Sequence, residues 1–241
     1  MRVVLMASGR GTNVQALLAA QPNWRADVRF VGLVSDRPEA PAIDLAKHHG
    51  LPTHIVTPSA ASDRDHWNRL LGHAVADLSP DLVVMAGFMR VVSADALRMF
   101  GVPAINVHPA LLPAFPGAHA IRDALAAGVR ITGVTVHQVI AEVDAGPVLE
   151  QEALRVLPHE DEPALAARIH AIEHRVLPRV VHALAVSAAL GNHARDEHLR
   201  QHARNERIGG RRNEDTAETF EPPPLAVQYR TGLALLDEQS A

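Results

Sequence analysis

Over residues 3–153, short apolar stretches, each about as long as one β-strand, alternate with segments about as long as a helix. This alternation restricts the possible folds more than any other feature of the sequence. Strands are expected at Val3–Ala7, Val28–Ser35, Thr53–Val56, Asp81–Ala86, Ala104–Val107, Ile131–Val139 and Pro147–Ala153. Helices are expected at Asn13–Ala20, Ala40–His49, Asp63–Leu78, Ala94–Phe100 and His119–Ala127. Strands that alternate with helices favour an α/β fold, with an open, mostly parallel sheet and helices on both faces. The last two strands are joined without a helix, which predicts a hairpin at that end of the sheet.

Composition narrows the class of protein further. Of the 241 residues, 47% are hydrophobic but only 3% are aromatic, so a core must be built from Ala, Val, Leu and Ile. The chain has no cysteine, which excludes disulfides, cysteine–zinc sites, iron–sulfur clusters and thiol catalysis. The net charge of −4 gives no sign of a nucleic-acid or membrane partner. The apolar run at the start is too short for a signal peptide and no stretch reaches membrane-span length, so we expect a soluble, cytoplasmic protein.

The character of the chain changes near residue 190. Ala164–Leu190 is predicted to form one long helix, with Pro178 as the point where it could bend. Residues 191–219 hold six arginines and six acidic residues but almost no large apolar ones, which is typical of a solvated helix or of disorder. Leu225–Leu236 is only weakly apolar. We therefore expect a catalytic domain at residues 1–190 and a polar, partly disordered extension at 191–241, whose removal should cost little stability.

A glycine turn, Ser8-Gly-Arg-Gly-Thr-Asn13, follows the first predicted strand and opens a helix. Backbone N–H groups and the helix dipole at such a turn favour an anion. The dinucleotide fingerprint is incomplete because Val14 stands where its third small residue belongs, and no Lys-Ser/Thr follows, as a P-loop would require. The turn is interpreted as a phosphate site; the alternative is a simple tight turn capped by Thr12 or Asn13.

Two hydrogen-bonding side chains, Asn106 and His108, stand at the end of the fifth predicted strand, directly before Pro109. Residues two apart in a strand share a face, and proline stops the ladder. The pair is thus expected where open α/β sheets bind ligands, although both side chains could merely satisfy loop backbone. Asp144, in the loop between the last two strands, could equally be an ordinary turn residue.

Four motifs together are far more specific than any one of them. They are S-G-x-G-[ST]-N at residues 8–13, A-G-F-M-R at 86–90, N-x-H-P-x-L-L-P-x-[FY]-P-G at 106–117 and V-D-x-G-P at 143–147. In this combination the chain resembles the phosphoribosylglycinamide formyltransferase family from residue 1 to about 188. The resemblance implies transfer of a formyl group from 10-formyltetrahydrofolate, a cosubstrate, to the amine of 5-phosphoribosylglycinamide in purine biosynthesis. It implies no metal, and a monomer or homodimer.

The resemblance also assigns roles to residues. Asn106 and His108 would donate to the oxyanion, His108 would be the general acid, and Asp144 would hold its proton and relay that of the amine. The ribonucleotide would contact Gly11, Thr12, Asn13, His170 and Glu173. The folate would contact Arg64, Met89, Arg90, Val91, Val92, Asn106, Ile140, Ala141, Glu142, Val143 and Asp144. His170 departs from the family pattern, which has a longer, non-imidazole polar residue there.

Four alternatives remain open at this point. Methionyl-tRNA formyltransferase and formyltetrahydrofolate deformylase share the same catalytic trio, but usually carry a tRNA-binding and a regulatory domain respectively. A nucleotide-binding module could use the glycine turn without catalysis, although it would have no use for the trio. Finally, His170-Ala-Ile-Glu-His174 matches the H-x-x-E-H pattern of inverted zinc proteases. No obvious third protein ligand follows, so we expect no zinc.

Overall fold

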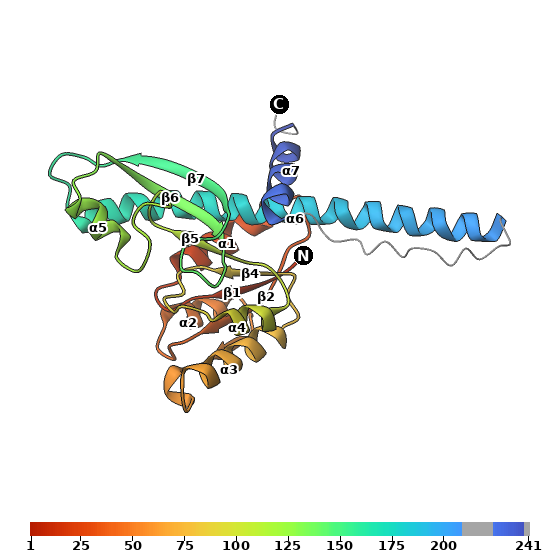
Figure 1. Cartoon of the computed structure of the whole chain (residues 1–241), viewed down its shortest axis with the longest axis horizontal. Helices are drawn as coiled ribbons and strands as arrows, with labels where there is room; N and C mark the ends of the chain where they lie inside the picture. The colour runs from red at the N-terminus through yellow and green to blue at the C-terminus, as the bar shows by residue number, and fades with distance from the viewer. Residues whose placement is uncertain (209–223, 239–241) are drawn as a thin grey trace.

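The computed structural model describes residues 1–208 and 224–238 (Figure 1). Seven strands form one sheet: β1 (Arg2–Met6), β2 (Arg29–Ser35), β3 (Thr53–Ile55), β4 (Leu82–Met85), β5 (Ala104–His108), β6 (Ile131–Gln138) and β7 (Val148–Arg155). The α-helices are α1 (Thr12–Ala20), α2 (Pro41–His48), α3 (Arg64–Ala76), α4 (Ala94–Phe100), α5 (Ala120–Ala126), α6 (Glu162–Ile208) and α7 (Leu225–Glu238). Two short 3-10 helices lie at Gln21–Asn23 and Pro58–Ala60. The predicted α/β alternation is confirmed.

The sheet order is β3-β2-β1-β4-β5-β6-β7. The first five strands pair in parallel, whereas β6 is antiparallel to β5 and β7 is antiparallel to β6. The chain order reverses direction between β1 and β4, so a crevice opens at the carboxyl ends of these strands. Open α/β sheets bind ligands at such a switch point.

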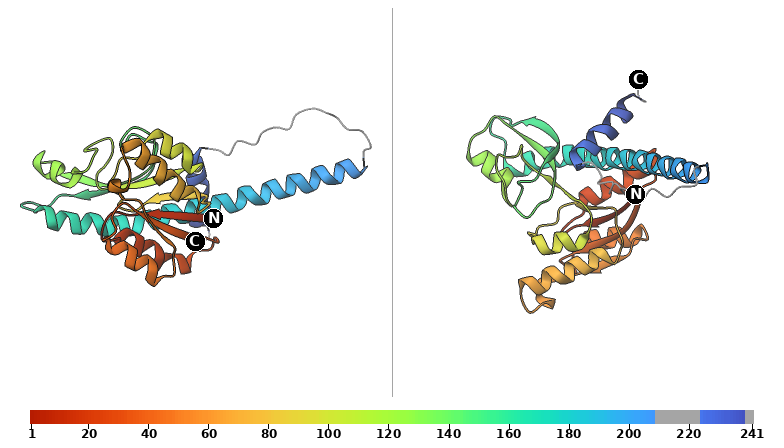
Figure 2. Two further views of the ribbon diagram at one scale, coloured as in Figure 1. Left: turned by 90° about the horizontal axis from the view of Figure 1, so that it is seen from below. Right: turned by 45° about the vertical axis from the view of Figure 1, so that its right-hand side comes forward.

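Helices cover both faces of the sheet because side chains of the central strands alternate between them. Val3 and Leu5 of β1 face one core cluster, which also contains residues of α1, α2 and α6. Val4 and Met6 face a second cluster, built with residues of α3 and α4. The separation of the two helical layers is visible in Figure 2. The packed layers fix the strand ends, and with them the loops that carry the polar motifs.

The long helix α6 continues through Pro178 and runs to Ile208, beyond the predicted end at Leu190 (Figure 1). Its first half packs on the sheet, where Leu165, Ile169 and Leu177 are fully buried. None of the helices in the described ranges has the length and apolar character needed to cross a membrane.

Helix α7 packs against α6 and β7. Leu225 and Tyr229 are 6% and 3% exposed and belong to the first core cluster. The Tyr229 hydroxyl donates to Glu150 of β7. At Gly232 a Cβ would lie 1.7 Å from the carbonyl oxygen of Ala183, so only glycine allows this close approach to α6. Helix α7 therefore buries Leu225 and Tyr229 against the core, which the weakly apolar composition of residues 225–236 did not indicate. The division of the chain at residue 190 stays a prediction.

Candidate active site

The glycine turn lies at the carboxyl end of β1 and leads into α1. Gly11 has a φ of 75°, and a Cβ there would stand 2.7 Å from the Cβ of Ala42, so the turn requires glycine. No side chain caps α1. The Asn13 side chain donates instead to Glu173 on α6, at 3.1 Å. The first turn of α1 therefore keeps its backbone N–H groups for a ligand, as the phosphate interpretation requires.

A polar cluster around Glu173 borders the glycine turn. Glu173 is 4% exposed, and its Oε2 lies 3.0 Å from Nδ1 of His170. The hydrogen bond with Glu173 raises the pKa of His170, although burial and the nearby charge of Arg10 oppose this shift. The Oδ1 of Asn13 is buried and has no partner within the described residues. A buried acceptor without a donor is costly unless a ligand supplies one, so the cluster points into a binding cavity.

This cavity, of about 270 Å³, has walls from the glycine turn, the loop after β4 and α6. All five residues predicted to contact the ribonucleotide line it: Gly11, Thr12, Asn13, His170 and Glu173. Arg10 and Arg37, which sequence reasoning did not single out, also line it. Their charges suit an anionic ligand.

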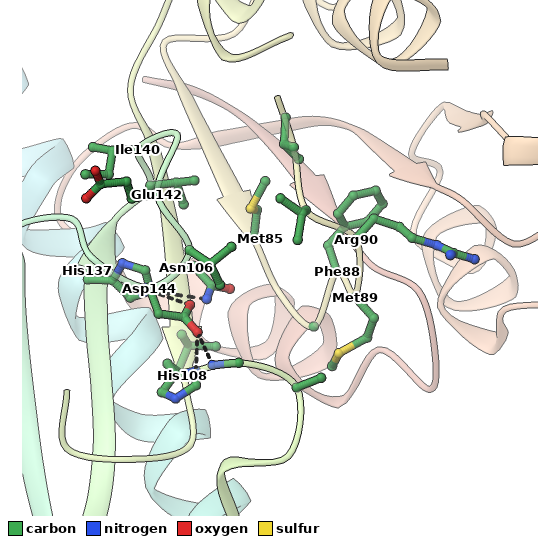
Figure 3. Close-up of a pocket in the computed structure, with 18 of the residues that line it drawn as sticks. Met85, Phe88, Met89, Arg90, Asn106, His108, His137, Ile140, Glu142 and Asp144 are labelled. Atoms are coloured by element: carbon green, nitrogen blue, oxygen red, sulfur yellow. Dashed lines mark hydrogen bonds and ion pairs between the residues drawn. The ribbon is translucent and has the colours of Figure 1, made fainter. Parts of the chain in front are cut away.

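The predicted trio converges at the end of β5 (Figure 3). His108 is 4% exposed; its Nδ1 lies 3.4 Å from Oδ2 of Asp144, and its Nε2 lies 2.8 Å from the carbonyl oxygen of Phe115. Both ring nitrogens thus face oxygen acceptors, and only the doubly protonated imidazolium can donate to both. Asp144 comes from the loop between β6 and β7, adopts a φ of 54°, and accepts a 2.7 Å hydrogen bond from the Gly117 N–H.

The electrostatics of Asp144 keep it ionised. Burial raises the pKa of its carboxyl group, but the hydrogen bonds with His137 and Gly117 and the charge of His108 outweigh burial. The pKa of Asp144 therefore lies below its usual value. The ionised carboxylate faces Nδ1 of His108 and can accept a hydrogen from it.

A fourth side chain, His137 of β6, joins the trio and was missed by the sequence reasoning. Its Nε2 lies 3.3 Å from Nδ2 of Asn106 and 3.5 Å from Oδ1 of Asp144, and its Nδ1 lies 3.0 Å from the carbonyl oxygen of Gln138. His137 is directly opposite Asn106 in the antiparallel register of β5 and β6. The signal in the sequence is a histidine near the end of a predicted strand. That position carries no information about the residue opposite it on the neighbouring strand.

A second cavity, of about 230 Å³, extends from the trio between two loops. One loop follows β4 and contributes Met89, Arg90, Val91 and Val92; the other contributes Ile140, Ala141, Glu142, Val143 and Asp144. Met89 and Val91 are 70% and 51% exposed. Exposed apolar side chains gathered around a few polar groups suit a flat, heterocyclic ligand.

Two arginines predicted to contact the folate are placed differently from the rest. Arg64 does not line the cavity. Its guanidinium donates to the Val91 carbonyl oxygen at 2.6 Å and so holds the loop that follows β4. Arg90 lines the cavity, but its guanidinium turns away from the trio, and its Nε donates to Asp36 at 2.7 Å (Figure 3). Both side chains therefore shape the loop.

The chain matches the formyl transferase family model over residues 1–181. It belongs to this family. The phosphoribosylglycinamide formyltransferase of Mycobacterium tuberculosis is 44% identical over 185 residues, which cover 76% of this chain and 85% of that protein. The enzyme of the same name from Escherichia coli is 34% identical over 181 residues, covering 75% and 85%. The crystal structure of glycinamide ribonucleotide transformylase 1 from Symbiobacterium toebii superposes with a TM-score of 0.74 and 38% identity, covering 77% of this chain and 87% of that one.

The predicted resemblance and the formyl transferase fold are thereby confirmed. Helix α7 lies outside the residues that the family model matches. The roles assigned to single residues stay predictions, although the structure brings Asn106, His108 and Asp144 together as expected.

Two of the alternatives, a nucleotide-binding module and a zinc site, can be compared with the structure. Asp36 directly follows β2, where dinucleotide-binding folds place an acidic residue for the ribose. Here its side chain is 1% exposed and paired with Arg90, so it is not offered to a nucleotide. His170 and His174 stack with ring centroids 6.4 Å apart, but His170 is engaged by Glu173. Among the described residues no group of three or more His, Asp or Glu side chains is arranged to hold a metal ion.

Proposed function

We propose that the chain transfers the formyl group of 10-formyltetrahydrofolate to the amine of 5-phosphoribosylglycinamide in purine biosynthesis. The observation that carries this proposal is the placement of Asn106, His108 and Asp144 beside two adjoining cavities, one at an anion-binding glycine turn and one with an apolar wall. The folate is the cosubstrate, and the reaction needs no metal. We keep the predictions of a cytoplasmic monomer or homodimer without a nucleic-acid or membrane partner.

The ribonucleotide occupies the cavity of the glycine turn. Its phosphate accepts from the backbone N–H groups of Gly11, Thr12 and Asn13, and Arg10 and Arg37 add positive charge. Glu173 and His170 contact the remaining polar groups of the ribonucleotide. This placement directs the amine toward the end of β5. The folate occupies the cavity between the two loops, so its formyl group reaches the trio.

The reaction forms a bond between the amine nitrogen and the formyl carbon and breaks the bond between that carbon and N10 of the folate. A tetrahedral intermediate with an oxyanion lies between these events. Asn106 donates an amide hydrogen to the oxyanion, and the His108 imidazolium donates a charge-assisted hydrogen bond. For this donation, His108 exchanges one of its bonds, to Phe115 or to Asp144, for the substrate.

Proton transfer completes the reaction. The amine loses a proton after it attacks, and N10 must gain one to leave. Asp144 accepts the proton of the amine through a water, and His108 delivers one to N10. His137 orients Asn106 and Asp144 through its contacts with both. No covalent enzyme intermediate is needed.

A spectrophotometric assay of folate product formation, with and without the ribonucleotide, tests the proposal. We expect product only with the acceptor, whereas product formed without it would indicate a deformylase. His108→Ala and Asp144→Ala should lower turnover by roughly 10²-fold or more, because acid–base and oxyanion assistance typically has that size, while substrate affinity changes little. Near-normal turnover in either folded variant would refute the mechanism.

A further inference from the structure

Ser8 connects the two halves of the site. It stands at the end of β1 and is 3% exposed. Its backbone N–H donates to the carbonyl oxygen of Gly87 at 3.0 Å, and its Oγ accepts from the backbone N–H of Met89 at 2.8 Å. One buried residue at the start of the phosphate turn thus holds the loop that walls the folate cavity.

The loop residue that Ser8 holds belongs to the partition between the two cavities. Gly87, Met89, Val107 and Pro109 line both cavities. Of these four residues, Gly87, Val107 and Pro109 lie at or next to the end of a strand. Met89 lies in a loop, and its side chain is 70% exposed. The position of Met89 therefore depends on the hydrogen bond of its N–H to Ser8 more than on packing.

The Ser8 hydroxyl still has a hydrogen to offer. Within the described residues it accepts from Met89 and donates to no other group. A hydroxyl can donate one hydrogen bond while it accepts others. Ser8 lines the cavity of the glycine turn, so a bound phosphate or ribose oxygen is the natural acceptor. Donation to such an oxygen makes the hydroxyl oxygen a stronger acceptor, because linked hydrogen bonds polarise one another.

We propose that Ser8 makes the binding of the two substrates cooperative, by donating to the ribonucleotide while its oxygen holds Met89 against the folate. This inference rests on the proposed function and adds a specific link between its two sites. When the ribonucleotide binds, the bond to Met89 shortens and the wall of the folate cavity becomes ordered. When the folate packs on Met89, the hydroxyl is held in the orientation that the ribonucleotide needs.

Equilibrium binding tests the link without turnover. Tetrahydrofolate carries no formyl group to transfer, so its dissociation constant can be measured by calorimetry with and without saturating 5-phosphoribosylglycinamide. We expect the ribonucleotide to tighten tetrahydrofolate binding by about 5-fold or more in the wild type, the lower end of usual coupling between sites, and the reverse experiment must give the same factor. In Ser8→Ala the factor should fall below about 2-fold.

Asp36→Asn is the matched control. This substitution weakens the ion pair that holds the same loop through Arg90, and within the described residues Asp36 makes no hydrogen bond to Ser8 or to the glycine turn. It should weaken tetrahydrofolate binding while the coupling factor stays at its wild-type value. A coupling factor that falls equally in Asp36→Asn would show general loosening of the loop and overturn the role of Ser8.

A measurement on the wild type keeps the proposal testable if Ser8→Ala does not fold. Hydrogen exchange of the Met89 amide should slow at least about 5-fold when the ribonucleotide alone is bound; unchanged exchange would overturn the proposal. A wild-type protein that transfers the formyl group but shows no coupling refutes this inference alone. A protein that binds neither ligand and transfers nothing refutes the proposed function itself.

Discussion

Tyr229→Ala should destabilise the protein strongly, even though Tyr229 lies outside the residues that the family model matches. The ring is 3% exposed in the first core cluster, and its hydroxyl donates to Glu150. Burial and this hydrogen bond raise the pKa of Tyr229, so the hydroxyl stays protonated and remains a donor throughout the usual pH range.

The magnitude follows from these contacts. Removing a buried aromatic ring costs about 3–5 kcal/mol, and the gain in helix propensity from alanine returns only about 0.5 kcal/mol. Tyr229→Phe keeps the ring and loses only the hydrogen bond to a carboxylate, for which about 1.5–3 kcal/mol is expected. Tyr229→Ala loses both the ring and the hydrogen bond, so its net cost is about 4–7.5 kcal/mol. In a chain of this length 1 kcal/mol lowers Tm by roughly 2–4 °C, so Tyr229→Ala should lower Tm by roughly 8–30 °C.

Thermal unfolding followed by circular dichroism measures the effect, with Val227→Ala as the control. Val227 is on the same helix but 49% exposed, so its truncation should change Tm by no more than about 1–2 °C, as is usual for surface positions. Formyl transfer at 20 °C or below should be unaffected in all three variants, because no residue of α7 lines either cavity of the site. If Tyr229→Ala and Val227→Ala have the same Tm, α7 is not packed against α6 and β7 in solution.

Three further predictions follow from the site. His137→Ala should lower turnover by roughly 10-fold or more at little cost in KM, because Asn106 and Asp144 lose the group that orients them; unchanged turnover would limit His137 to packing. The pKa of His170 is raised, so KM for the ribonucleotide should increase as pH rises above about 6.5 and passes through that pKa, because the imidazolium loses its charge. His170→Gln should remove this increase. A parallel rise in both proteins would assign the dependence to another group. Gly11→Val should raise KM for the ribonucleotide by roughly 10-fold or more without changing KM for the folate, since a side chain at a φ of 75° meets Ala42. Gly191→Ala, which also has open space around it but lies outside the cavity of the glycine turn, should be nearly neutral. If the two glycine variants change KM for the ribonucleotide equally, the phosphate does not bind at the glycine turn.

Much of the fold was predictable because it is encoded locally. The apolar runs gave every strand, and the segments between them gave α1 to α5, since periodicity and length report burial without knowledge of partners. The chemistry of the trio was also predictable, because Asn106 and His108 share a strand face and Pro109 ends that strand. Residues 225–236 were undervalued because composition averages over a segment. Two buried side chains and one glycine against a helix backbone decide the docking of α7.

The order of amino acids specifies which residue types stand at the strand ends, and so the class of chemistry that the chain can perform. Which of these residues come into contact depends on the folded arrangement of the strands and helices. His137 joins the trio because antiparallel pairing sets it opposite Asn106, and a register shift of one residue would turn it to the other face. Arg64 and Arg90 support the folate loop because the acceptors for their guanidinium groups, the Val91 carbonyl and Asp36, lie in segments distant in sequence. Ser8 reaches Met89 because β1 and β4 are neighbours in the sheet, although residues 7–81 of the chain lie between the two strands. Contacts of this kind depend on long-range pairing and close packing, which no local pattern contains.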